Sequence, residues 1–174
     1  MNVLKRKRFK KRQGRLWEEF VMGSHEVQFF PVNLYSSFEA NFVNVVEAQP
    51  KDYDPQNPLE QQVLLEMKEL VEKIFGAEIY LYLCVGLPID FHGTDLLVVS
   101  WTTKSYVVID LTTNPLKSYK ADVLFTPRDW NNSTRMEEFC RNVSLLLEQN
   151  PDRISEEALV LLKKVSRFSE EKAP

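Results

Sequence analysis

Four apolar runs follow one another between residues 77 and 126, separated by short polar segments. They are rich in β-branched and aromatic residues, which favour strands. The runs are AEIYLYLCV (77–85), DLLVVSW (95–101), YVVIDLTT (106–113) and KADVLFT (120–126). The second and third are joined by a four-residue polar turn, which predicts a hairpin, and Asn114-Pro115 signals a turn before the fourth. Such a series of runs must bury its apolar side chains in a β-sheet.

Helical patterns precede and follow these runs. Asn57 suits an N-cap, Pro58 suits a first turn, and Gly76 can end the helix between them. Two further helices are predicted over 133–150, capped by Asn132 or Ser133, and over 154–168. The first helix carries one apolar stripe, formed by Val63, Met67, Leu70, Val71 and Ile74. This order predicts an α/β chain of the α+β kind, with a mixed central β-sheet flanked by helices.

The chain before residue 58 has a weaker pattern. Residues 14–24 could form a short helix, and 26–35 an edge strand interrupted by a proline. The apolar spacing over 36–48 fits both helix and strand. Residues 49–58 hold three prolines and several turn-forming residues, which predicts a loop.

Charge is distributed unevenly along the chain. Residues 1–15 hold eight basic residues and no acidic one, whereas the remainder holds 14 basic and 25 acidic residues. Because like charges repel and nothing there can be buried, we expect 1–15 to be a disordered basic arm and 16–174 a single domain. Such an arm suits contact with nucleic acid, DNA in particular, although a solubilising or targeting tail has the same composition. The basic residues are Lys5, Arg6, Lys7, Arg8, Lys10, Lys11, Arg12 and Arg15.

Several classes of protein are disfavoured by what the sequence holds. Two cysteines, Cys84 and Cys140, make neither a disulfide framework nor a zinc site, and a reducing compartment fits them. Two histidines, His25 and His92, disfavour zinc hydrolysis by several histidine ligands. No stretch has the length of a membrane span, and the basic N-terminus lacks the apolar core of a secretory signal. We therefore expect a cytoplasmic chain without a membrane partner.

Two carboxylates sit where strands favour apolar residues. Asp95 opens the second run and Asp110 lies late in the third, so a hairpin would make them neighbours. A buried, unpaired carboxylate is costly, so each needs an exposed strand end, an ion-pair partner or a metal. Two adjacent carboxylates without a nearby histidine suit Mg²⁺ or Mn²⁺, which prefer oxygen ligands. The backbone carbonyl of Leu111 could add a ligand.

Glu60 is a third candidate. On a helical wheel it lies near the direction of Val63 and Met67, at the N-terminal end of the predicted helix. It could therefore face the two aspartates as a ligand of a metal. Asn57 and Glu60 also have capping-box spacing, so the glutamate could instead bond the start of its own helix.

This arrangement resembles the PD-(D/E)XK, or restriction-endonuclease-like, superfamily, which includes Holliday-junction resolvases and many phage, plasmid and mobile-element nucleases. The resemblance covers roughly 59–126. Asp95 in GTDLLVV matches the first motif aspartate, Asp110 in VVIDLTT the acid of the second, and Glu60 the helix glutamate of resolvase-like members. It implies a restriction-endonuclease-like core and metal-dependent phosphodiester hydrolysis with Mg²⁺ or Mn²⁺. Many nucleases of this type pair up to cut both strands, so a homodimer is also implied.

The sequence departs from that pattern at one position. The family places a lysine two residues after the strand acid, where it is thought to position the attacking water, and this chain has Thr112 there. If the chain turns back after Asn114-Pro115, Lys120 would come opposite or next to Asp110, with Lys117 behind it. Both are also explained as solvated turn lysines. The family's strand after its second helix is missing from 150–174, and 120–126 or 26–35 could supply it.

Three hypotheses follow for the function. The first is a metal-dependent nuclease in which Asp95 and Asp110 hold the cation, with Glu60 and a lysine beside them. The second is a module with the same fold, inactive because of Thr112, that binds DNA or a protein partner. The third is a structural or adaptor protein of a phage or mobile element whose basic arm meets nucleic acid.

Overall fold

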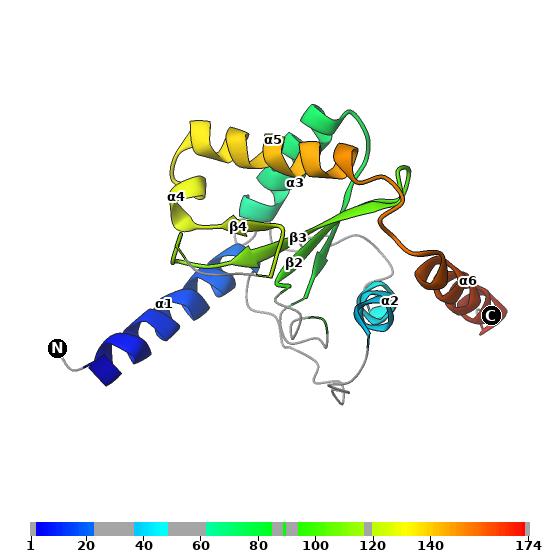
Figure 1. Ribbon diagram of the computed structural model, residues 1–174, viewed down its shortest axis with the longest axis horizontal. Helices are drawn as coiled ribbons and strands as arrows, with labels where there is room; N and C mark the ends of the chain where they lie inside the picture. The colour runs from blue at the N-terminus through cyan, green and yellow to red at the C-terminus, as the bar shows by residue number, and fades with distance from the viewer. Residues whose placement is uncertain are drawn as a thin grey trace.

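The computed structural model describes residues 3–22, 37–48, 62–84, 89, 94–116 and 120–172. The predicted fold class is confirmed, because a mixed sheet lies between helices (Figure 1). None of the helices in the described part is long and apolar enough to cross a bilayer. In chain order the elements are α1 (Val3–Met22), α2 (Phe38–Ala48), α3 (Gln62–Phe75), β1 (Tyr80–Leu83), β2 (Leu96–Ser100), β3 (Ser105–Leu111), β4 (Val123–Phe125), α4 (Pro127–Trp130), α5 (Ser133–Gln149) and α6 (Glu156–Lys172).

The sheet has the strand order β1-β2-β3-β4. β1 pairs antiparallel with β2, with Leu83 opposite Leu96. The predicted hairpin of β2 and β3 is confirmed, with Leu96 opposite Ile109. The fourth strand pairs parallel to β3, with Ile109 beside Val123. Of the two segments that could supply an additional strand, 120–126 does so as β4, whereas 26–35 lies outside the described residues.

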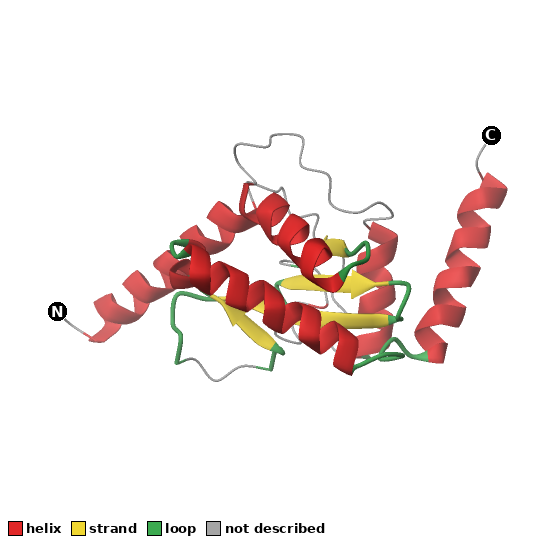
Figure 2. Cartoon of the chain, turned by 90° about the horizontal axis from the view of Figure 1, so that it is seen from above, coloured by secondary structure: helices red, strands yellow, loops and turns green. Residues whose placement is uncertain are grey.

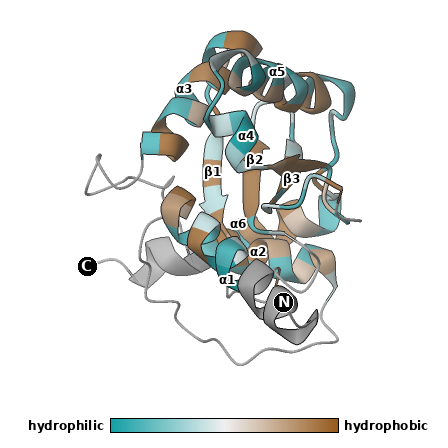
Figure 3. Cartoon of the chain, turned by 90° about the vertical axis from the view of Figure 1, so that its left-hand side faces the viewer, coloured by the Kyte–Doolittle hydropathy of each residue, from teal (hydrophilic) through white to brown (hydrophobic). Residues whose placement is uncertain are grey.

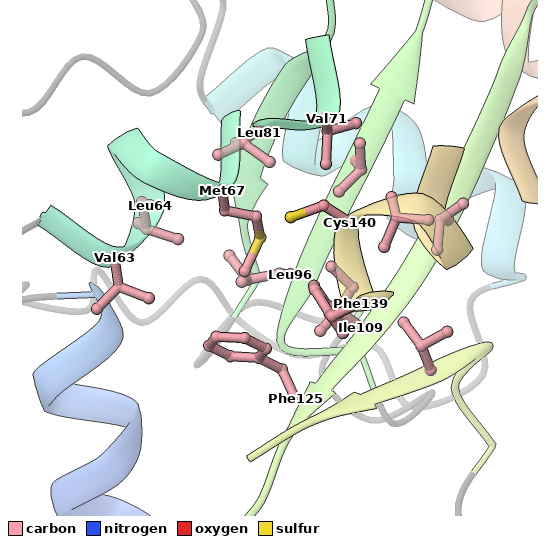
Figure 4. Close-up of a cluster of buried hydrophobic side chains, with 14 of the residues drawn as sticks. Val63, Leu64, Met67, Val71, Leu81, Leu96, Ile109, Phe125, Phe139 and Cys140 are labelled. Carbon is pink, nitrogen blue, oxygen red and sulfur yellow. The ribbon is translucent and has the colours of Figure 1, made fainter. Parts of the chain in front are cut away.

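Helices cover both faces of the sheet. On one face, α3 and α5 pack on each other and on the odd-numbered side chains of β3 (Figures 1 and 4). On the other face, α2 packs against α6 and over β1 (Figure 2). Colouring by hydropathy shows the apolar strands between these polar-faced helices (Figure 3). The predicted stripe of α3 is confirmed, since Val63, Met67 and Val71 are buried in the first core and Leu70 and Ile74 are partly buried against it.

The helix ends also follow from the sequence. Asn132 caps α5, because its Oδ1 accepts a hydrogen bond from the Arg135 N–H at 3.2 Å. Gly76 follows α3 with a φ of 78°, a conformation that glycine adopts at low cost. The ambiguous segment 36–48 is helical, as α2. The proposed cap of α3 at Asn57, the loop 49–58 and Glu60 lie outside the described residues.

The N-terminal region differs from the prediction. The expected disordered arm over 1–15 and the short helix over 14–24 are replaced by one helix, α1, from Val3 to Met22, so the boundary placed at residue 15 falls inside an element. Trp17, Val21 and Met22 anchor its end in the first core, and Trp17 Nε1 donates to the Phe125 carbonyl at 3.0 Å. Lysine and arginine are good helix formers, so a helix anchored at one end can continue through a basic sequence.

Candidate functional site

The two predicted acids meet at one end of the sheet. Asp95 directly precedes β2 and Asp110 lies on β3 next to Ile109, the residue opposite Leu96. The Asp95 N–H donates to the Ile109 carbonyl at 3.0 Å, and Asp95 Oδ2 accepts from the Leu111 N–H at 2.7 Å. The Asp95 and Asp110 carboxyl groups are hydrogen bonded to each other, and their residues are only 5% and 7% exposed. The hairpin therefore places the acids side by side, as the sequence predicted.

The surroundings of Asp95 favour the protonated form of its carboxyl group. Burial raises the pKa of Asp95 to about 9, with further upward shifts from its hydrogen bond with Asp110 and from the negative charge of Glu18 on α1. The Leu111 N–H opposes this rise in pKa, because it stabilises the ionised carboxylate. At neutral pH Asp95 therefore keeps its proton and can donate it in the hydrogen bond to Asp110. A proton thus does in this site what a bound cation could do, which is to relieve the repulsion between two adjacent acids.

The donor set can be tested against the predicted metal. Among the described residues, no group of three histidine, cysteine, aspartate or glutamate side chains lies close enough to hold an ion. Two carboxylates still fit Mg²⁺, which often takes one or two of them and fills its remaining positions with water and substrate phosphate. Glu60, the predicted additional ligand, lies outside the described residues. Among the described residues, Asp95 and Asp110 are the side chains that could hold a cation, with the Leu111 carbonyl next in the chain.

The predicted lysine is not where the sequence placed it. The expectation that Lys120 lies opposite or next to Asp110 is wrong, because β4 runs parallel to β3 and brings Leu124 beside Asp110. Lys120 precedes β4 and lines a cavity together with Tyr106 and Val108, earlier residues of β3. The error came from the Asn114-Pro115 signal, which marks a turn but does not fix the direction of the next strand. Lys117 lies outside the described residues.

Thr112 has a structural role at the position of the family lysine. It is buried, its N–H donates to the Phe125 carbonyl at 3.1 Å, and its Oγ1 accepts from the Asn114 N–H at 3.1 Å. The threonine therefore holds the end of β3 against β4 and begins the connecting turn. It supplies no positive charge to Asp110.

The predicted nucleic-acid contacts all belong to α1. Lys5, Arg6, Lys7, Arg8, Lys10, Lys11, Arg12 and Arg15 fall within this helix, which extends from the body of the molecule toward the N-terminus (Figure 1). Arg12 and Arg15 are exposed. Glu18, three residues after Arg15, acts electrostatically on Asp95, so the C-terminal part of α1 lies near the acidic pair.

One polar cluster was not predicted from the sequence. Arg153 forms a two-pronged ion pair with Asp122, with N–O distances of 2.6 and 3.2 Å, and donates to the Tyr106 carbonyl at 3.0 Å. Its guanidinium also lies 4.1 Å from the centre of the Tyr106 ring. Asp122 and Arg153 are 31 residues apart in the chain, and no local pattern in the sequence indicates that pairing.

Comparison with known proteins gives no match to a family model, to a curated protein or to a solved structure.

Proposed function

We propose that this chain is a metal-dependent nuclease of the restriction-endonuclease-like type, acting on DNA with Mg²⁺ or Mn²⁺. The observation that carries the proposal is the buried, hydrogen-bonded pair of Asp95 and Asp110 at the end of two adjoining strands. Two carboxyl groups in contact in the interior do not stabilise a fold, because their burial is costly unless a ligand compensates for it. Asp95 and Asp110 are also the residues that the family resemblance matches to its two motif acids.

In this proposal Asp95 and Asp110 hold the cation after the proton of Asp95 leaves. A bound Mg²⁺ or Mn²⁺ would lower the pKa of a water and offset charge on the scissile phosphate. The hydrogen bond from the Leu111 N–H holds the Asp95 carboxyl group in place beside Asp110. Because a proton must leave when the cation enters, metal affinity should rise with pH until Asp95 is ionised without metal.

The basic helix supplies the second part of the proposal. Contacts from lysine and arginine to phosphates position a nucleic acid without reading its sequence. Since α1 ends beside the acidic pair, a strand held along the helix is led toward Asp95 and Asp110. The proposal includes a cytoplasmic location, where DNA is accessible in a prokaryotic or phage context, and a homodimer when both strands are cut.

The test is incubation of the full chain with plasmid and branched DNA, with Mg²⁺, with Mn²⁺ and without either metal. We expect metal-dependent cleavage by the wild type, a loss of at least about a hundredfold in Asp110→Asn, and no change in Glu69→Gln, an exposed acid on α3. Asp110→Asn should still shift DNA in a gel, and the shift should weaken with salt. Cleavage that persists undiminished in Asp110→Asn, or is missing from the wild type with either metal, contradicts the nuclease.

A second candidate function is favoured by Thr112. Its backbone and hydroxyl are engaged in holding β4 and the following turn, and it brings no cation to the site. The chain would then be a catalytically inactive nuclease fold that binds DNA or serves as an adaptor. Salt-sensitive gel shifts by the wild type, without cleavage under any metal condition, would favour this candidate over the nuclease.

A further inference from the structure

A cavity lies on the face of the sheet that α2 and α6 cover. Its volume is about 270 Å³, which is room for a small ligand or one group of a larger one. Its wall combines aromatic, aliphatic, hydroxyl and cationic side chains from five separate parts of the chain. They are Phe38, Thr94, Tyr106, Val108, Lys120 and Arg153.

Thr94 is the first reason to assign a ligand to this cavity. The residue is fully buried, and its Oγ1 has no hydrogen-bond partner. A buried hydroxyl without a partner costs free energy that folded proteins rarely leave uncompensated. A ligand with an acceptor atom in the cavity would satisfy it.

Charge is the second reason. Arg153 is neutralised by its ion pair with Asp122, and that pair fixes the guanidinium over the Tyr106 ring. Lys120 has no ion pair with any described residue, although it lines the same cavity. Among the described residues that line the cavity, Lys120 is therefore a cation without an ion pair, on the same wall as a hydroxyl that lacks a partner.

We propose that this cavity binds an oxyanion of the phosphate class, with Lys120 Nζ as its charge partner and the Thr94 hydroxyl as a hydrogen-bond donor. A phosphate group has several acceptor oxygens, so it can meet both groups at once. Phe38 and Val108 form the apolar part of the wall. The inference does not require that Asp95 and Asp110 cleave anything.

The test measures binding of inorganic phosphate to the full chain by calorimetry and by the shift in thermal unfolding, at constant ionic strength. We expect saturable binding by the wild type and a loss of about tenfold or more in both Lys120→Gln and Thr94→Val. Lys73→Gln, an exposed lysine on α3, is the matched control and should bind as the wild type does. Thr94→Val removes a hydroxyl that has no partner, so the free protein should be no less stable, which separates lost binding from lost folding.

Two outcomes overturn the proposal. One is that phosphate, tested up to millimolar concentration, fails to bind the wild type. The other is that Thr94→Val and Lys120→Gln bind it as tightly as the Lys73→Gln control. Asp110→Asn should retain phosphate binding, so failure of the nuclease and failure of this site are distinguishable.

The source of the phosphate is resolved by two further probes. A short oligonucleotide with a 5′-phosphate is compared with the same oligonucleotide ending in a 5′-hydroxyl, and both are compared with a nucleoside monophosphate. Preference for the phosphorylated oligonucleotide, lost in Thr94→Val, supports the site as one for nucleic-acid ends. Equal binding of the free monophosphate supports it as a site for a small metabolite. A preference that Thr94→Val leaves unchanged counts against the cavity.

Discussion

The two faces of the sheet are built differently. The face under α3 and α5 is a continuous aliphatic and aromatic core in which Met67, Val71 and Phe125 are fully buried (Figure 4). The face under α2 and α6 is rich in aromatic rings, and it also holds the Arg153–Asp122 pair, the unpartnered Thr94 hydroxyl and the cavity.

The difference separates what stabilises the fold from what is available for chemistry. Close-packed apolar side chains contribute stability through burial, and they leave no room for a ligand. Buried polar groups contribute less, and each has to be matched by a partner. The acidic pair lies at the end of β2 and β3, where the regular ladder ends. We therefore expect substitutions on the first face to affect unfolding most, and those on the second face to affect binding.

The largest expected effect is on the first face. Phe125 packs between Trp17 and Phe139, with ring centroids at 5.5 and 4.7 Å, so Phe125→Ala should lower the free energy of unfolding by about 4–5 kcal/mol. The matched substitution on the second face is Phe42→Ala, which removes a ring beside an existing small cavity and should cost about 3 kcal/mol. Urea unfolding measures both. An equal or larger loss in Phe42→Ala would break the distinction between the faces.

The next effect concerns pH and the acidic pair. Because the pKa of Asp95 is raised from 3.8 to about 9, the folded chain holds a proton that the unfolded chain has released over this range. The free energy of unfolding should therefore fall as pH rises from about 4 to 9, by of the order of a few kcal/mol, and then level off. Asp95→Asn can keep both hydrogen bonds without the proton and should remove most of this slope. Glu69→Gln should retain the slope, and a wild-type stability that rises across this window would contradict the assignment.

The smallest effect compares two ion pairs with the same N–O distance of 2.6 Å. Arg153–Asp122 is partly buried on the second face, whereas Arg141–Glu137 is exposed on α5, with side-chain exposures of 64% and 53%. Arg153→Met should cost about 1–2 kcal/mol, because it also removes the contact with the Tyr106 carbonyl. Arg141→Met should change stability by no more than about 0.5 kcal/mol. Thermal unfolding of both variants tests this, and equal losses would mean that burial adds nothing to the pair.

Local signals in the sequence accounted for much of the fold. The stripe on α3 and the hairpin between β2 and β3 depend on residues close together in the chain, and both were predicted correctly. The cap of α5 is Asn132, one of the two residues that the sequence proposed for it. The meeting of Asp95 and Asp110 followed from that hairpin, since antiparallel register is set by a short turn.

The features that the sequence did not predict depend on contacts between residues far apart in the chain. The parallel pairing of β4 and the pairing of Asp122 with Arg153 are decided by packing, for which a turn signal or a lone aspartate contains no information. The helical state of α1 was missed because charge repulsion was weighed without the anchor that Trp17 provides in the core. The cavity around Thr94 depends on five segments meeting, so no single stretch of sequence could indicate it.

Because α1 is one continuous helix, it fixes the distance between its basic N-terminal part and the acidic pair. A helix rises about 1.5 Å per residue, so Lys5 stands about 20 Å along the axis from Glu18, whose charge is felt by Asp95. One DNA strand advances about 3.4 Å per nucleotide, so that length corresponds to about six nucleotides. If α1 binds a DNA duplex as proposed, the duplex would be protected on one side of the acidic pair only. Inserting one helical turn after Arg12 would move that boundary by about one or two nucleotides.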